Sequence, residues 1–448
     1  RRETTSSISW RKSIKDSPSS YYYKKRNQRA FIETRKMSKE TFITKSEFTF
    51  ASKNTEYKEM NLGIDRMSLA IYAMGNPCKK TPAIHIVGTN GKGSIAAFIN
   101  SVLSLVKIKT GITTSPHLVD WVERVCINKT QISKKEFQSL SLALTPIIDK
   151  YNLTPFECVI AIALKYFTLR EVELLILEVG LGGRLDATTA HQYRPIIAFG
   201  AIGLDHCEYL GNSLEKVAIE KAAVITTKST VITATQDNIV KRVLEETAKR
   251  KQAVIHWVDP IPSDWELGLS GVIQKENAAV AKGVIESLKN IGWNISEGQL
   301  REGLSLAKWP GRLQTTKWEG MPIVVDGAHN PHAANQLSIE RDAWTNQESG
   351  IIWILGIQKR KDMIDILHNL IRENDFAWIV PVPGQNSWSK AEILSLCPEY
   401  KHQIKEALCV EEILSILKKQ DRWPSPPPII SGSLYLIGDL FQRGILIN

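Results

Sequence analysis

The 448-residue sequence lacks any apolar run long enough to span a bilayer, and it has no secretory apolar core near its beginning. Internal repeats are also absent. The six cysteines are scattered, and no two are spaced as a C-x-x-C pair. Scattered cysteines in a long chain are typical of reduced thiols in a cytosolic enzyme. These absences predict a cytoplasmic protein that is not a membrane protein.

A basic excess is lacking over most of the chain, although the net charge is +10. Residues 1–45 contain thirteen Lys and Arg against four Asp and Glu, which leaves about +1 for the other residues. The body of the protein therefore has no global basic surplus, and we do not expect it to bind nucleic acid.

The basic segment over 1–45 is rich in Ser, Thr, Lys and Arg and has little periodic pattern. Such a composition is typical of an organellar transit peptide. A second interpretation is a wrongly assigned start, with Met37 as the true initiator. The interpretation we favour is a basic, disordered tail.

Length and composition predict an ordinary globular protein of two or three domains, with 43% apolar and 23% charged residues. From about residue 60, apolar strands alternate with helical stretches, which is typical of an α/β fold with a largely parallel sheet. Strands are predicted at 83–87, 174–179, 195–202 and 231–235, and helices at 95–106, 134–150, 156–169, 214–225, 238–251 and 276–290. The predicted first domain, with this largely parallel sheet, covers residues 46–308.

A second strand and helix series follows the Trp-Pro-Gly-Arg punctuation at 309–312. Its predicted strands are 322–325, 350–355, 377–380 and 428–431, and its predicted helices are 330–339, 363–374, 391–396 and 410–418. We expect this series to form a smaller, Rossmann-like α/β domain over residues 309–448.

A glycine-rich turn joins the first predicted strand to its helix. The turn consists of Gly88, Thr89, Asn90, Gly91, Lys92, Gly93 and Ser94. Glycines let backbone N–H groups converge on phosphate oxygens, a lysine reaches the terminal phosphates, and a serine hydroxyl can bind magnesium. The spacing departs from G-x-x-x-x-G-K-[ST], because the first spacer is short and Gly93 separates Lys92 from Ser94. An ordinary glycine turn is the alternative, but strand, lysine, serine and helix all stand where nucleotide binding needs them. We therefore expect the domain over residues 46–308 to be an ATPase domain of the P-loop type.

Three further strand ends carry polar residues. Glu178 ends a strand before a glycine turn, Asp205 and His206 follow another, and Asp326 and His329 follow a third. Ligands of open α/β sheets bind outside the carboxyl ends of the strands, so these side chains are candidates for metal, ribose and phosphate contacts. Taken singly, Glu178 could be a helix cap and His206 a surface histidine.

The sequence resembles the folylpolyglutamate synthase/dihydrofolate synthase family within the Mur-type ATP-dependent ligases. The resemblance rests on the turn at 88–94, which has that family's extra glycine, and on seven further motifs in the family's order. These are at 114–118 with 123–124, 177–188, 205–206 with 210–211, 220–222, 309–312, 326–331 and 431–435. Together they span roughly residues 57–440.

The resemblance implies roles for individual residues. Lys92 would hold the β- and γ-phosphates, and Ser94, Glu178 and His206 would be magnesium ligands, with two magnesium sites expected. Lys221, by itself an ordinary solvated helix lysine, matches the lysine that this family carbamylates into a metal ligand. Lys92, His206 and Lys221 would then be the catalytic residues.

The resemblance also implies the substrate contacts. The nucleoside of ATP would meet Asn277, Arg312, Asp326 and His329. The folate site would be lined by Thr114, Ser115, Pro116, His117, Leu118 and Arg124. The sequence departs from the usual family pattern at Trp121-Val122, Cys207, Asn212-Ser213 and Ala223.

The implied reaction is ATP-dependent addition of L-glutamate to dihydropteroate or to the γ-carboxylate of a folate, by way of an acyl phosphate. The residues do not separate a bifunctional enzyme from one restricted to elongation. Two alternatives stay open, a Mur-type ligase acting on a cell-wall precursor and a nucleotide-binding module with a decayed site. The family also implies a potassium requirement in some members and a monomeric state.

Overall fold

The computed structural model describes residues 63–344 and 350–447, which belong to a compact unit running from Glu59 to Asn448. The predictions for the tail over 1–45, including Met37 as an initiator, lie outside the described residues. Within the described ranges, no helix has both the length and the apolarity needed to cross a membrane.

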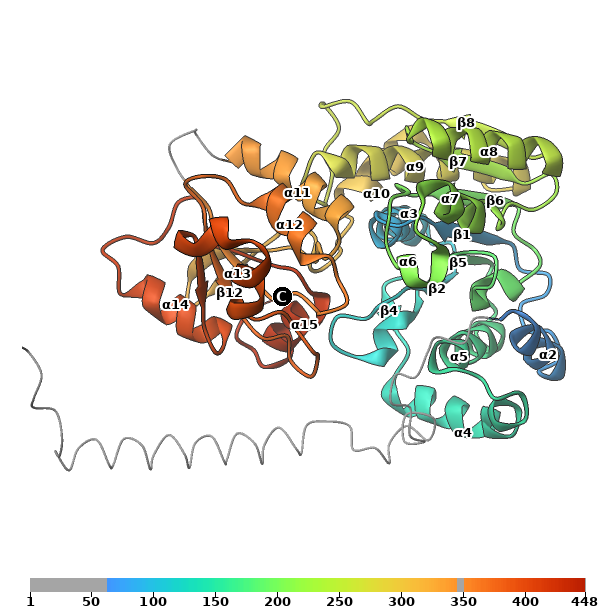
Figure 1. The fold of residues 1–448 in the computed structure, drawn as a ribbon. Helices are drawn as coiled ribbons and strands as arrows, with labels where there is room; N and C mark the ends of the chain where they lie inside the picture. The colour runs from blue at the N-terminus through green and yellow to red at the C-terminus, as the bar shows by residue number, and fades with distance from the viewer. Residues whose placement is uncertain (1–62, 345–349, 448) are drawn as a thin grey trace, which may run out of the picture. The chain divides into compact units, whose positions relative to one another are not determined.

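The first sheet has eight strands in the order β4-β3-β2-β5-β1-β6-β7-β8 (Figure 1). Its strands are β1 (Ala83–Val87), β2 (Thr110–Thr113), β3 (Val125–Ile127), β4 (Thr130–Gln131), β5 (Leu174–Glu178), β6 (Ile196–Phe199), β7 (Thr230–Thr233) and β8 (Val254–Trp257). The strands β2, β5, β1, β6, β7 and β8, in that order across the sheet, pair in parallel. The strands β3 and β4 form an antiparallel extension next to β2 at one edge. Because the parallel strands share a direction, the turns that follow β1, β5 and β6 meet at one edge of the sheet.

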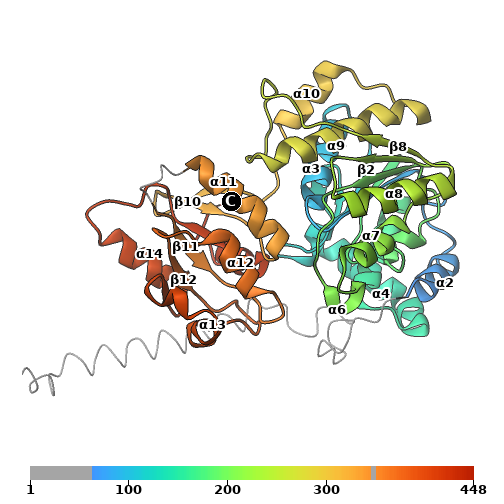
Figure 2. The ribbon, with the colours of Figure 1, turned by 45° about the horizontal axis from the view of Figure 1, so that its top comes forward.

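Helices cover both faces of this sheet. Ile84 and Ile86 of β1 belong to the core formed with α3, α9 and α10, while Val87 belongs to the core formed with α7 and α8. Figure 2 shows α9 and α10 on one side of the sheet and α7 and α8 on the other. The helices of this part are α2 (Asp65–Ala73), α3 (Lys92–Leu105), η1 (Trp121–Arg124), α4 (Lys134–Tyr151), α5 (Pro155–Leu169), η2 (Ala187–Ala190), α6 (Cys207–Leu210), α7 (Leu214–Ala222), α8 (Asn238–Lys251), α9 (Ile273–Ser287), η3 (Leu288–Ile291) and α10 (Glu297–Ser305).

The second sheet has six strands in the order β13-β12-β11-β14-β10-β9, and it is parallel except for the β9–β10 pair. Trp353 and Leu355 of β11 enter the core beneath α11, α12 and α13, and Ile354 enters the core beneath α14 and α15. The elements are β9 (Gln314–Trp318), β10 (Met321–Val325), α11 (Pro331–Trp344), β11 (Ile352–Leu355), α12 (Met363–Leu370), β12 (Phe376–Ile379), α13 (Lys390–Leu396), η4 (Pro398–His402), β13 (Ile404–Glu406), α14 (Val410–Lys418), β14 (Ile429–Ser431) and α15 (Leu434–Gln442).

The predicted α/β class, with a parallel sheet followed by a second sheet, is confirmed. Each predicted strand and helix has a counterpart, usually with ends shifted by a few residues; α3 starts at Lys92 rather than 95 because Gly91 takes φ +83 and begins the helix. The prediction missed β2, β3, β4, β8, β9, β13, α2, α6, α10 and α15. The proposed division at 308 and 309 falls between α10 and β9 and stays a prediction.

Candidate active site

The glycine-rich turn is tightly enclosed. A Cβ placed on Gly91 would stand 2.3 Å from Oδ1 of Asn277, and one on Gly93 would stand 2.7 Å from Nε1 of Trp309. The backbone N–H groups of Thr89 and Asn90 donate to the carbonyl of Ala201, 2.8 and 3.1 Å away, which anchors the turn to the loop after β6. The turn at the N-terminus of α3 therefore has little room for side chains, as a phosphate-binding loop requires.

Two lysines converge on this turn. Nζ of Lys92 donates to the carbonyl oxygens of Gly88 (3.1 Å) and Thr89 (3.2 Å), and Nζ of Lys221 donates to the same Gly88 oxygen at 2.9 Å. Burial lowers the pKa of the Lys92 ammonium, and burial together with the nearby Lys92 lowers the pKa of Lys221 to about 7. Within the described residues neither lysine forms an ion pair, so the Lys92 ammonium can offer its positive charge to an anion.

Glu178 lies at the end of β5 and is 3% exposed. One of its oxygens, Oε2, accepts a hydrogen bond from the backbone N–H of Ser115 at 3.0 Å. Burial raises the pKa of Glu178 to about 7, although the positive charge of Lys92 opposes that rise. The turn after Glu178 is held by Asp186, whose Oδ2 accepts the N–H groups of Gly180 and Leu181 at 2.9 and 3.1 Å.

His206 begins the short helix α6 with φ +52. Its ring nitrogens lie 3.9 Å from Oδ2 of Asp205 and 3.8 Å from Oε1 of Glu208. Burial lowers the pKa of His206 to about 4 in spite of these carboxylates, so the imidazole is neutral at pH 7. A neutral imidazole has the free nitrogen lone pair that a metal ligand needs.

The predicted magnesium ligands fit that ion by their chemistry. Ser94 and Glu178 are both 3% exposed and supply a hydroxyl and a carboxylate oxygen, the donors that magnesium prefers. Within the described residues, Glu178 and His206 do not belong to a group of three or more His, Cys, Asp or Glu side chains with ligand atoms within 4.8 Å of one another. Such a group lies at His368, Cys397 and Glu399. The set of Ser94, Glu178 and His206 therefore stays a prediction.

The turn after β10 meets the glycine-rich turn through amide side chains. Nδ2 of Asn330 donates to Oδ1 of Asn90 at 3.2 Å and to Oδ2 of Asp205 at 2.9 Å. Nδ2 of Asn90 donates to Oδ1 of Asn330 at 3.3 Å and lies 2.9 Å from Nδ1 of His332. These bonds bring the predicted nucleoside contacts to the same edge as the predicted phosphate site.

Asp326 is buried, and both its oxygens accept backbone N–H groups, from Leu313 at 2.9 Å and Ala328 at 2.8 Å. Burial raises the pKa of Asp326, and the nearby Arg312 guanidinium opposes that rise. Nδ1 of His329 lies 2.7 Å from the carbonyl of Gly327. These residues shape the turn after β10, and the expected contacts of Arg312, Asp326, His329 and Asn277 with a nucleotide stay predictions.

The loop predicted to line a folate site is held in a fixed form. Nε of Arg124 donates to Nδ1 of His117 at 2.9 Å, and the guanidinium carbon lies 4.4 Å from the Trp121 ring centroid. The Glu123 carboxylate accepts three successive backbone N–H groups, from Leu118 to Asp120. Because the Ser115 N–H binds Glu178, Thr114, Ser115, Pro116, His117 and Leu118 lie beside the predicted metal site.

One charged residue of this region was missed in the sequence. Nζ of Lys361 lies 2.7 Å from Oδ1 of Asp205, and the two side chains are only 8% and 12% exposed. Burial alone would raise the pKa of Asp205, but Lys361, with His206 and His329, holds it well below its usual range. The sequence could have indicated Lys361 only by its position after the carboxyl end of β11, a strand that was predicted.

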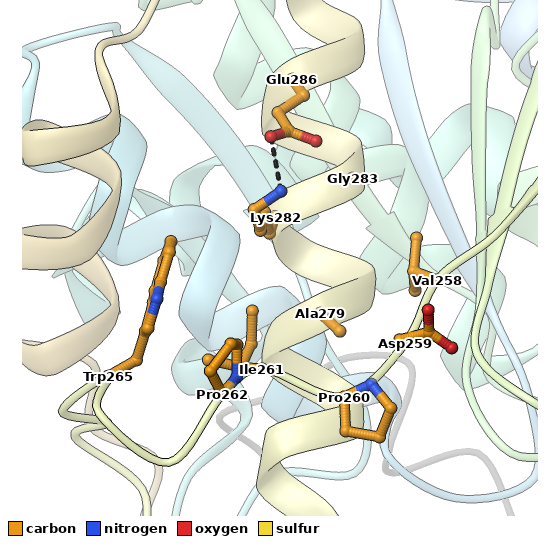
Figure 3. A pocket seen from close by; sticks show the side chains of 10 residues that line it. All are labelled: Val258, Asp259, Pro260, Ile261, Pro262, Trp265, Ala279, Lys282, Gly283 and Glu286. Atoms are coloured by element: carbon orange, nitrogen blue, oxygen red, sulfur yellow. Dashed lines mark hydrogen bonds and ion pairs between the residues drawn. The ribbon is translucent and has the colours of Figure 1, made fainter.

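A separate cavity of about 380 Å³ lies against α9, and none of its lining residues is a predicted site residue (Figure 3). Its walls include Ile261, Pro262 and Trp265, and at one end Nζ of Lys282 donates to Oε1 of Glu286 at 2.6 Å. The predicted active site therefore does not coincide with this cavity.

The comparisons with known proteins agree with this architecture. The family model described as the Mur ligase middle domain matches residues 86–260, which include the glycine-rich turn, Glu178, His206 and Lys221. Fold and site thus define a protein of the Mur ligase class. The model described as the dihydrofolate synthetase C-terminal domain matches residues 311–443. The chain belongs to the dihydrofolate synthase/folylpolyglutamate synthase family.

Two curated relatives match nearly end to end. The dihydrofolate synthetase of Saccharomyces cerevisiae is 30% identical over 419 residues, which cover 86% of this chain and 98% of the relative. The dihydrofolate synthase/folylpolyglutamate synthase of Bacillus subtilis is 34% identical over 418 residues, covering 85% and 94%. Escherichia coli FolC, solved in complex with DHPP and ADP, is 26% identical with a TM-score of 0.77, and the match covers 87% of this chain and 95% of that one.

Proposed function

We propose that this chain is an ATP-dependent amide ligase that joins L-glutamate to the carboxylate of dihydropteroate or of a folate. The observation that carries the proposal is the buried ammonium of Lys92, which lies on the Gly88 carbonyl beside Lys221 and has no carboxylate within ion-pair distance in the described residues. A nucleotide with several phosphate groups supplies the missing negative charge. The relatives' printed names, dihydrofolate synthetase and folylpolyglutamate synthase, support the substrate class.

In the proposed reaction, the substrate carboxylate attacks the γ-phosphorus of ATP, and the bond from that phosphorus to ADP breaks. Lys92 stabilises the negative charge that spreads over the phosphoryl oxygens. The amine of glutamate then attacks the acyl phosphate carbonyl, a C–N bond forms, and phosphate leaves. Magnesium, held by Ser94, Glu178 and His206, would neutralise phosphate charge when bound.

Lys221 is proposed to react with carbon dioxide and become a carbamate. Only a neutral amine can attack carbon dioxide, and burial beside Lys92 lowers the pKa of Lys221 to about 7, so much of the amine is neutral at physiological pH. Carbamylation would turn the Lys221 side chain from a cation that repels Lys92 into an anion that attracts it. Mass spectrometry of the native protein with labelled bicarbonate tests this step.

The nucleoside is proposed to contact Asn277, Arg312, Asp326 and His329, and the pterin-bearing substrate to contact the loop from Thr114 to Leu118 with Arg124. Asn277 already lies against the glycine-rich turn, and the Ser115 N–H already binds Glu178. Two magnesium ions, a potassium requirement, a monomeric state, a cytoplasmic location and the absence of nucleic-acid and membrane partners also stay predictions.

The experiment is glutamate-dependent release of phosphate from ATP, with dihydropteroate and tetrahydrofolate tested as separate acceptors. Release with both would establish a bifunctional enzyme, and release with tetrahydrofolate alone would establish an elongating synthase. Release only with a cell-wall precursor would replace the proposal by the Mur-type alternative. Binding of ATP without release with any acceptor would support a decayed site.

A further inference from the structure

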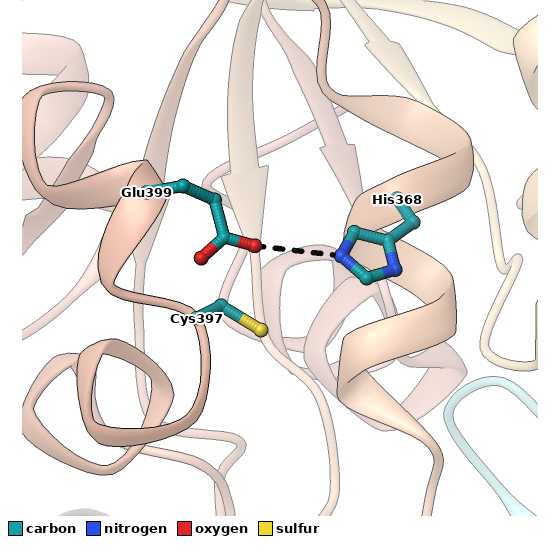
Figure 4. Close-up of side chains that lie close together, drawn as sticks. All are labelled: His368, Cys397 and Glu399. Carbon is teal, nitrogen blue, oxygen red and sulfur yellow. Dashed lines mark ion pairs between the residues drawn. The ribbon is translucent and has the colours of Figure 1, made fainter.

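A second group of metal-binding side chains lies on α12 and at the start of η4, at a place that the proposed reaction does not use. It consists of His368, Cys397 and Glu399, whose ligand atoms all lie within 4.8 Å of one another. Figure 4 shows the thiol, the imidazole and the carboxylate turned toward a common point. The group combines the sulfur, nitrogen and oxygen donors that zinc accepts in proteins.

The separations are close to those that a tetrahedral ion needs. Nε2 of His368 lies 3.6 Å from Oε1 of Glu399. With Zn–N and Zn–O bonds of about 2.1 Å and a Zn–S bond of about 2.3 Å, tetrahedral ligands lie roughly 3.4 to 3.6 Å apart. The nitrogen and oxygen atoms are thus already at about the right spacing, and the thiol needs at most a shift of about 1 Å, within reach of side-chain rotation.

The thiol is held at this point by the backbone. Cys397 lies between α13 and η4 and caps both. Its N–H donates to the Ile393 carbonyl at 2.8 Å, and its carbonyl accepts the Tyr400 N–H at 3.3 Å. Its side chain, 3% exposed, lies at the margin of the core beneath α12 and α13. His368 and Glu399 are 51% and 57% exposed, so an ion can enter from solvent.

We propose that His368, Cys397 and Glu399 form a binding site for a thiophilic divalent cation of the zinc type, with water completing the coordination. Zinc fits better than magnesium or calcium because those ions prefer sets of oxygen ligands. The ion would join the last turn of α12 to the start of η4, where the rings of His368 and Tyr400 lie 6.0 Å apart. The site would act as a clamp within the second α/β part.

The test is titration of the purified full chain with Co²⁺, which gives visible absorption and a thiolate charge-transfer band when it is bound tetrahedrally by sulfur. We expect one equivalent with that band, displaced by Zn²⁺, and a higher melting temperature with Zn²⁺. Cys397→Ser should abolish the band. His368→Gln and Glu399→Gln, which change exposed side chains, should weaken binding by more than the roughly 10- to 100-fold that loss of an outer-shell partner costs, because they remove direct ligands.

Matched controls are Cys207→Ser and Cys409→Ser, which change exposed free thiols, and His402→Gln, which changes an exposed histidine of η4. All three should keep the band and the affinity. The proposal is overturned if the band survives Cys397→Ser, if it disappears with Cys207→Ser or Cys409→Ser instead, or if the folded wild-type chain shows no sulfur-bound cobalt. Glutamate ligation by the same samples is a separate readout, so failure of the metal site and failure of the proposed function are distinguishable.

Discussion

At the carboxyl end of the first sheet, Lys92 and Lys221 donate to backbone carbonyls and have no carboxylate within ion-pair distance among the described residues. At the corresponding end of the second sheet, Lys361 is paired with Asp205, and both Asp326 oxygens accept backbone N–H groups. The first end therefore keeps the charge of Lys92 available to a ligand. At the second end the charges are satisfied, that of Lys361 by Asp205 from the loop after β6 of the first sheet and that of Asp326 by backbone N–H groups. The same α/β architecture thus presents a cation to a ligand in the first part, and in the second part it uses its charged residues to hold loops in place.

The largest expected effect is on the uncompensated side of this comparison. Lys92→Met should lower kcat about a thousandfold or more, because an aliphatic side chain cannot stabilise the phosphoryl oxygens. Thermal unfolding should show a folded protein, since Lys92 has no ion pair to lose. Lys249→Met, on the exposed face of α8, is the matched control and should leave phosphate release unchanged.

On the compensated side, Lys361→Met should cost stability. The substitution leaves Asp205 buried without its cation, for which a loss of about 3–5 kcal/mol in the free energy of unfolding is typical. Denaturant unfolding measures this loss. The double variant Asp205→Asn with Lys361→Met should recover a large part of it, and Arg242→Met, which breaks an exposed pair with Glu215, should cost about 0.5 kcal/mol or less. Equal losses of unfolding free energy for Lys361→Met and Arg242→Met would contradict a buried ion pair between Lys361 and Asp205.

Alanine variants of two glycines distinguish the effect of backbone strain from the effect of crowding at the phosphate loop. Gly91 and Gly75 both have φ +83, but a Cβ on Gly91 would meet Asn277, and one on Gly75 would meet nothing within 4 Å. Both alanine variants should lose about 1 kcal/mol of stability from strain. Gly91→Ala alone should raise the KM for ATP, about tenfold, because it displaces Asn277. A raised KM in Gly75→Ala would show that strain and not crowding is responsible.

The last effect concerns pH. His85 of β1 is fully buried, and burial, with Arg194 and His191, lowers its pKa well below the usual value of about 6.5. The unfolded chain therefore takes up a proton first as the pH falls, and stability decreases below about pH 6.5 by about 1.4 kcal/mol per pH unit for this histidine. Urea midpoints between pH 7 and pH 5 measure the slope. His85→Gln should reduce the slope by about that amount, whereas His402→Gln, at an exposed histidine, should leave it unchanged.

The sequence predicted the elements that carry their own local signal. The run of glycines with Lys92 and Ser94 between an apolar strand and a helix predicted the turn, and strand–helix alternation predicted both sheets. The strands β3 and β4 were missed because they are two or three residues long, and Thr130 and Gln131 are exposed, so no periodicity marks them. Their pairing comes from tertiary contact with β2.

The predicted site residues gather at one edge, but some contacts depend on packing that no pattern encodes. Asp205 and Lys361 are 156 positions apart, and their ion pair exists because two loops from different sheets meet. Asp326 is a predicted ribose contact, and that prediction stays open; the sequence did not indicate that its oxygens also accept the N–H groups of Leu313 and Ala328. The strand-end positions of Asp205 and Asp326 predicted that these polar residues lie near a ligand. Only the fold shows which protein groups their carboxylates contact.

The central claim is activation of a carboxylate by ATP, and oxygen transfer tests it most directly. The acceptor carboxylate is labelled with oxygen-18, and the phosphate released in the presence of ATP and glutamate is analysed by mass spectrometry. The proposed acyl phosphate predicts one labelled oxygen in each phosphate released, because the carboxylate oxygen leaves with the phosphorus. Phosphate without label would show that water and not the carboxylate attacks ATP, and would contradict the ligase.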